Sequence, residues 1–156
     1  MKKILLIGLA ILTLSACAAK AKPSFSAADA SITINGKKLT PGMDYTTPPL
    51  GTPVDYYEHS SCAYVGLDKI YTYDAIEVYT YPDGKTDYIL EIDLLETGKT
   101  TRGIKIGSTL ANVEAVYGTA YTTQGLNIVY ADGQISLVIM LVNNKVDQIR
   151  LTYTPQ

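Results

Sequence analysis

The feature that most constrains the fold is a two-residue alternation of apolar and polar side chains through residues 69–94. The apolar positions of this alternation are Ile76, Val78, Tyr88, Leu90, Ile92 and Leu94. The positions that alternate with them are Glu77, Tyr79, Tyr81, Glu91 and Asp93, and Pro82-Asp83-Gly84 marks a turn. Because successive side chains of a strand point to opposite faces, this pattern predicts half-buried antiparallel strands.

A helix and further strands are expected after residue 103. Ile104-Lys105-Ile106 is another short alternating run, Ser108 is a candidate N-cap, and Gly118 is a stop signal. The apolar positions at helical spacing between them are Leu110, Val113, Val116 and Tyr117. The expected strands that follow are 126–130, 135–142 and 149–153, with turns at Asp132-Gly133 and Asn143-Asn144. Residues 135–142 are nearly all apolar, which predicts a strand covered on both faces.

These elements predict an α+β domain with an antiparallel sheet of about eight strands and one main helix at about residues 108–117. A shorter helical or irregular segment is expected at about residues 39–50, because four prolines between residues 40 and 53 disfavour a long helix. Residues 31–98 and 103–154 resemble each other, since each half begins with Ile-x-Ile and carries a Tyr-x-Asp-Gly turn. The sequence therefore favours two related halves.

The N-terminus has the pattern of a lipoprotein signal peptide. Two lysines precede an uncharged run from Ile4 to Leu14, which is too short to span a bilayer as a helix. The run ends in Leu14-Ser15-Ala16-Cys17, which matches a lipobox. We therefore expect residues 1–16 to be removed and the Cys17 thiol to form a thioether with diacylglycerol.

The sequence then predicts a flexible tether at residues 17–30 and a single domain at residues 31–156. The tether is expected because its Ala, Ser and Lys composition is poor in residues that could form a core. Two acyl chains give a stable anchor, so we expect the mature protein on the outer face of the cell membrane.

The charge composition limits the classes of partner that the protein could bind. The chain after residue 16 carries 11 basic and 15 acidic residues, a net charge of −4, and no basic run. Nucleic acid is not an expected partner, because its binding depends on Lys and Arg at phosphates. The chain has thirteen tyrosines but only one Phe and no Trp. This composition favours sheet surfaces that are apolar yet partly exposed to solvent.

Two resemblances add to this interpretation. The stretch from Gly103 through Ser108 to Gly118 resembles the helix entry of the β-lactamase-inhibitor-protein-like fold, which small outer-membrane assembly lipoproteins of the SmpA/OmlA type share. The stretch Ser61 to Lys69, followed by Tyr71-Thr72-Tyr73, is similar to uncharacterised lipoproteins of Gram-positive gut anaerobes. The first resemblance implies a fold, the second carries no known activity, and neither supplies site residues.

Candidate chemistry is sparse. Cys62 is a lone thiol; with His59 it could form a nucleophile–base pair on a helix, but a packed thiol is favoured. Glu91 and Asp93 share a strand face at a spacing that does not exclude glycoside hydrolysis, although a solvated face is favoured. The two Asp-Gly pairs fit turns better than calcium loops. We expect no cofactor, no metal site and no catalytic residues.

Glu77, Tyr79 and Tyr81 are the best candidates for a binding surface, because exposed aromatic patches mark interaction sites. The alternative is that these side chains pack under a loop. The sequence favours a non-enzymatic module that binds a protein or an envelope polymer through this face. A hydrolase would instead show a cleft with two carboxylates, and a small-ligand carrier would show a closed apolar cavity.

Overall fold

The computed structural model describes residues 22–156, and it is dominated by one antiparallel sheet of eight strands in the order β3-β4-β5-β6-β10-β9-β8-β7. The strands of this sheet are β3 (Asp55–Ser60), β4 (Leu67–Thr72), β5 (Ile76–Asp83), β6 (Thr86–Leu94), β7 (Thr122–Gln124), β8 (Asn127–Asp132), β9 (Ile135–Val142) and β10 (Lys145–Tyr153). The other elements are the 3-10 helix η1 (Ala27–Asp29), the hairpin β1 (Ile32–Ile34) and β2 (Lys37–Leu39), and the helix α1 (Leu110–Tyr117).

The sheet consists of two meanders, β3 to β6 and β7 to β10, whose last strands pair with each other. Leu94 pairs with Ile149 and Glu91 pairs with Thr152 across this junction. Short turns connect neighbouring strands. Asn143 and Asn144 both have positive φ, 51° and 60°, which is the backbone that favours Asn and Gly in a two-residue hairpin turn.

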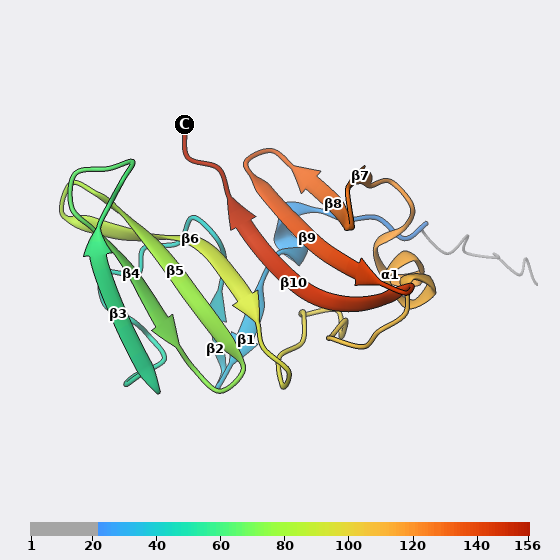
Figure 1. Ribbon diagram of the computed structural model, residues 1–156, viewed down its shortest axis with the longest axis horizontal. Helices are drawn as coiled ribbons and strands as arrows, with labels where there is room; N and C mark the ends of the chain where they lie inside the picture. The colour runs from blue at the N-terminus through green and yellow to red at the C-terminus, as the bar shows by residue number, and fades with distance from the viewer. Residues whose placement is uncertain (1–21) are drawn as a thin grey trace, which may run out of the picture.

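One face of the sheet is covered, and this covered side contains the core. Figure 1 shows β1, β2 and η1 behind the main sheet, with α1 beside the second meander. The hairpin and the loop after it contribute Ile32, Leu39 and Tyr45 to the core, and α1 contributes Val113 and Tyr117. These side chains pack on the sheet's buried positions, which include Val78, Ile92, Ile139, Ile149 and Leu151. No element lies in front of the opposite face in the described part of the chain (Figure 1).

The predicted eight-stranded antiparallel sheet and single main helix are present, but the molecule is nearly all-β, with a helix of only eight residues. The helix begins at Leu110 because Thr109, not Ser108, is its N-cap: the Thr109 side chain accepts from the Asn112 amide. The Ser108 hydroxyl instead accepts from the Lys105 amide. The segment at residues 40–50 is irregular, without a helix.

Two strand expectations were wrong. Residues 104–106 form no strand, although Ile104 is buried in the core. The strand β9 is covered on one face only: Leu137 and Ile139 are fully buried, whereas Val138 and Met140 are half-buried. Apolar side chains that face solvent explain why its sequence had the composition of a strand buried on both faces.

The alternation in β6 is broken by a β-bulge. Tyr79 pairs with Glu91, but the next residue of β5, Thr80, pairs with Ile89, so Leu90 is an extra residue. A bulge shifts the face of every residue beyond it. Ile89, rather than Leu90, is therefore fully buried beside Ile92 and Leu94.

The ordered domain begins earlier than residue 31. Phe25 packs against Tyr117 and Tyr130, with ring centroids 6.1 and 5.8 Å away. The Arg102 guanidinium donates to the Ser24 carbonyl at 2.8 Å. Residues 23–30 of the predicted tether thus lie against the domain. The signal peptide, the lipidation residue Cys17 and the tether up to residue 21 lie outside the described residues.

Gly118→Ala should detach this N-terminal segment. Gly118 has φ +79°, and an added Cβ would lie 2.3 Å from the Pro23 carbonyl oxygen. We expect a loss of about 1–3 kcal/mol, because φ +79° with ψ −170° is a backbone conformation that essentially only glycine adopts. We also expect faster proteolysis between residues 22 and 30. Gly125→Ala is the control, because Gly125 has φ +62° and nothing within 4 Å of the new Cβ. Equal proteolysis in the two variants would contradict the packing of residues 23–30.

Candidate functional site

The candidate site lies on the uncovered side of the sheet, which we call the outer face. Residues paired directly across neighbouring strands share a face, so the register defines its rows. One row runs from Tyr57 through Ile70, Tyr79 and Glu91 to Thr152. The next row consists of Asp55, Thr72, Glu77, Asp93, Arg150, Val138 and Val129. The outer face therefore crosses both meanders and their junction.

Glu77 and Tyr79 hold each other in place on β5. The Tyr79 hydroxyl donates to Glu77 Oε2 at 2.8 Å, and the Thr72 hydroxyl donates to Glu77 Oε1 at 3.2 Å. Both Glu77 and Tyr79 are half-buried. Burial, followed by the hydrogen bond to Glu77, raises the pKa of Tyr79. The phenol therefore stays protonated, and its ring is fixed on the outer face. The sequence predicted both Glu77 and Tyr79 as candidate binding residues, but not the hydrogen bond between them.

Arg150 is the single guanidinium beside two carboxylates at the junction. Its Nε lies 3.2 Å from Asp93 Oδ1 and 3.2 Å from Glu91 Oε1. The register explains this sharing, because Arg150 is directly opposite Asp93 and Glu91 is the diagonal neighbour. The Asp93 and Glu91 side chains are only 12 and 23% exposed. Glu77, on the strand beyond, adds a third carboxylate to this patch.

The electrostatics of this patch favour a proton on Glu91. Burial, together with the neighbouring Asp93 carboxylate, raises the pKa of Glu91 to about 7, although Arg150 opposes the shift. Burial also raises the pKa of Asp93, and Arg150 again acts in the opposite direction. Three carboxylates against one guanidinium leave the patch net negative. Its charge therefore changes near neutral pH, through Glu91.

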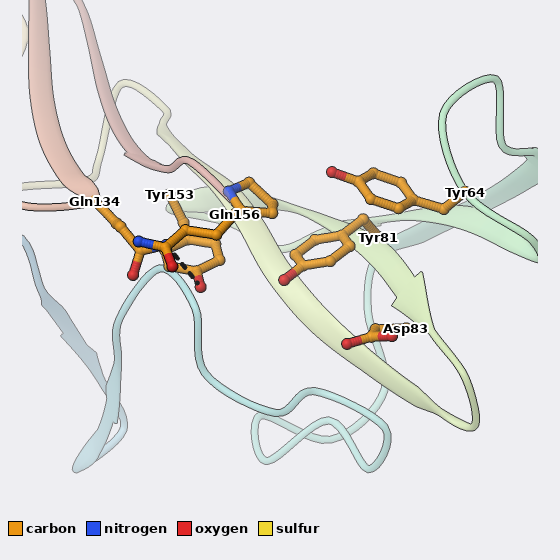
Figure 2. A pocket seen from close by; sticks show the side chains of 7 residues that line it. Tyr64, Tyr81, Asp83, Gln134, Tyr153 and Gln156 are labelled. Atoms are coloured by element: carbon orange, nitrogen blue, oxygen red, sulfur yellow. Dashed lines mark hydrogen bonds between the residues drawn. The ribbon is translucent and has the colours of Figure 1, made fainter.

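Tyr81 has different partners from Glu77 and Tyr79. Its side chain is 6% exposed and packs on Tyr64, Tyr88 and Tyr153, with ring centroids 4.8, 5.9 and 6.3 Å away. Figure 2 shows Tyr64 beside Tyr81, and Tyr153 and Gln134 on the other side of a hollow. Of the three predicted binding residues, Glu77 and Tyr79 therefore form the outer face, while Tyr81 lines a pocket at its end.

The lone thiol Cys62 is exposed, so the prediction of a packed thiol is wrong. The reason is its place in the loop between β3 and β4, where neighbouring side chains such as Val65 also face solvent. His59 lies on β3, its Nδ1 is 3.0 Å from the Ser60 carbonyl oxygen, and its ring contacts Tyr57. Within residues 22–156 no hydrogen bond joins His59 to Cys62.

Metal-ligand clusters, membrane-spanning helices and hollows are the other features that could define a site. Within residues 22–156, no group of three His, Cys, Asp or Glu side chains could hold a metal ion. No helix in this range has the length and apolar character needed to cross a bilayer. Three open hollows are present, and neither Glu91 nor Asp93 lines any of them. The two carboxylates are largely buried among their neighbours on the outer face, so the favoured prediction of a solvated strand face is wrong, because Arg150 and the neighbouring strands cover them.

Comparison with known proteins finds no match to this chain among protein-family models, curated proteins or solved structures. The resemblances to the β-lactamase-inhibitor-protein-like fold and to Gram-positive lipoproteins therefore stay predictions.

Proposed function

We propose that the protein is a lipid-anchored module on the outer face of the cell membrane that binds a protein or envelope polymer through the outer face of its sheet. The observation that carries this proposal is the uncovered row of Tyr57, Ile70, Tyr79 and Glu91 across four adjacent strands. Tyr57 is 59% exposed, and tyrosine supplies contact area at low cost in conformational entropy. The module acts by binding and performs no catalysis.

Charge narrows the chemistry of the partner. The patch of Glu77, Glu91 and Asp93 around Arg150 is net negative, so an anionic polymer would be repelled. A surface with amino or guanidinium groups would complement it. The apolar side of the same face, with Val129 and Val138 on β8 and β9, extends the contact beyond the charged patch. The favoured partner is therefore a protein or polymer segment that carries positive charge beside apolar groups.

The arrangement of the two meanders supports a duplicated origin. We infer that residues 31–98 and 103–154 are related halves of one α+β unit, because the last strand of each meander pairs antiparallel with the other. Each half also has a short covering element before its meander, the β1–β2 hairpin or α1. The first half lacks a helix in this position, which is its main departure from the β-lactamase-inhibitor-protein-like pattern.

Tyr79→Ala should remove capture of the partner. Chemical crosslinking in intact cells, followed by purification of the protein, is expected to recover one specific partner with the wild type and at least tenfold less with Tyr79→Ala, as for a central interface tyrosine. Tyr121→Ala is the matched control, since Tyr121 is a half-buried tyrosine that packs on Tyr130 at the covered side. The same partners in both variants would show that the outer face does not bind.

A further inference from the structure

A second feature lies apart from the patch around Arg150: a hollow of about 310 Å³ between the end of β5 and the end of β10. It forms because the meanders separate beyond the junction. The part of β6 that does not pair with β10 forms hydrogen bonds with residues 42–45 instead. The Gly42 amide donates to the Ile89 carbonyl at 2.7 Å, and the Ile89 amide donates to the Met43 carbonyl at 2.9 Å. The two sheet halves therefore diverge, and side chains from both line the space.

Tyrosine rings form the two walls of this hollow, which we call the tyrosine pocket. Tyr81 and Tyr153 are nearly parallel, with an angle of 16° between their rings, and Tyr64 packs on Tyr81. Close backbone approaches fix both walls. A Cβ on Gly66 would lie 2.8 Å from Pro82, and a Cβ on Gly42 would lie 3.1 Å from the Tyr153 ring. The pocket is thus built before any ligand arrives.

Several neutral polar groups of the pocket are available to a ligand. Gln134 Nε2 donates to the Thr154 carbonyl at 3.0 Å and approaches the Tyr153 hydroxyl at 3.4 Å. This orients the amide, and its oxygen has no hydrogen bond within the described residues. The hydroxyls of Tyr64 and Tyr81 also have no hydrogen-bond partner in that range, and Figure 2 shows both on the side that faces Tyr153.

The lining discriminates between ligand classes. It contains no Lys or Arg, and its only acidic side chain is Asp83, which is exposed at the rim. An anion would find no counter-charge. An aromatic cage places several ring faces around a quaternary ammonium. Tyr64 covers the ring of Tyr81, with 4.8 Å between the ring centroids, and Tyr81 is only 6% exposed, so it offers no face to such a cage. A neutral ligand with several hydroxyl groups and an apolar C–H face would match this lining. Its C–H face would pack on the tyrosine rings, and its hydroxyl groups would pair with the Gln134 amide and the tyrosine hydroxyls.

We propose that the tyrosine pocket binds a neutral pyranose ring, with Tyr64 and Tyr153 packing against it and Gln134 and the tyrosine hydroxyls pairing with its hydroxyl groups. The volume is near the lower limit of small-molecule pockets, so the pocket takes a short saccharide end rather than a long chain. This site does not depend on the outer-face function, because none of these residues belongs to the patch around Arg150.

The test is saturation-transfer NMR on the full-length protein in a non-ionic, non-glycosidic detergent. The probes are methyl β-D-glucopyranoside, cellobiose and N,N′-diacetylchitobiose, with choline as the cationic comparison. We expect at least one saccharide to bind with a Kd of about 1–10 mM. Tyr64→Ala and Gln134→Ala should each weaken this binding about five- to tenfold. Both side chains lie at the surface or are half-buried, so the fold should remain.

Tyr79→Ala is the control, and it should bind the saccharide as well as the wild type does. If Tyr79→Ala binds the saccharide normally but fails to capture a protein partner, the defect concerns the outer face and not the tyrosine pocket. The absence of a saturation-transfer signal from all three saccharides at about 20 mM, which is well above the expected Kd range, would overturn the proposal. So would choline binding in their place, or saccharide binding that survives both Tyr64→Ala and Gln134→Ala.

Discussion

Cys17→Ala is expected to abolish lipid labelling of the protein completely. The predicted lipobox Leu14-Ser15-Ala16-Cys17 contains one thiol that could form the diacylglycerol thioether, and no other residue in that motif could form it. Cells grown with a clickable fatty-acid analogue should therefore label the wild type and not the variant. Under the proposal, the two acyl chains of the diacylglycerol would give stable membrane attachment, so the variant should also lose the mature lipidated form on a gel.

Cys62→Ala is the matched control for this experiment, since it removes the chain's other thiol. Cys62 lies exposed in the loop between β3 and β4, so its loss should leave both the labelling and the fold unchanged. Undiminished labelling of Cys17→Ala would contradict the lipoprotein assignment, and with it the location of the binding module.

Glu91→Gln is expected to remove a large part of the pH dependence of stability. The pKa of Glu91 is about 7 in the folded protein and 4.5 as the reference value. Between these values the folded state holds a proton that the unfolded state has lost, so stability falls as the pH rises. At 1.36 kcal/mol per pKa unit, the wild type should lose roughly 2–3 kcal/mol between pH 4.5 and pH 7.5.

Urea unfolding at several pH values measures this effect. Gln cannot ionise, so Glu91→Gln should match the wild type near pH 4.5 and be more stable above pH 7. Glu96→Gln, which removes an exposed carboxylate after β6, should follow the wild-type curve at every pH. Parallel curves for wild type and Glu91→Gln would show that the pKa of Glu91 is the same in the folded and the unfolded protein.

Much of the sheet could be predicted from the sequence because alternation and turn residues are local signals. The strands of the region 69–94 and the turn at Asn143-Asn144 appear where expected. The bulge at Leu90 could not be predicted, because an extra residue in one strand is defined only by its partner. The packing of Phe25 was also missed, since a single aromatic residue in a polar segment has no periodicity.

The candidate site was predicted in part for the same reason. Glu77 and Tyr79 share a face by simple alternation, and they meet in a hydrogen bond. Arg150 was missed, because its approach to Glu91 and Asp93 depends on the pairing of strands more than 50 residues apart in the chain. Tyr81 was assigned to the same surface as Tyr79, but the divergence of β6 and β10 places it in the tyrosine pocket. Long-range register, which no local pattern encodes, decides both outcomes.

The central claim, that the outer face is occupied in the cell, can be measured with two methionines. Met140 is half-buried on the outer face of β9, and Met43 is half-buried in the segment that packs on the covered side. Hydroxyl-radical oxidation of intact cells and of the purified protein should differ at Met140, which a bound partner would protect, and should be equal at Met43. If Met140 oxidises at the same rate relative to Met43 in both samples, the outer face is free and the proposed binding function is wrong.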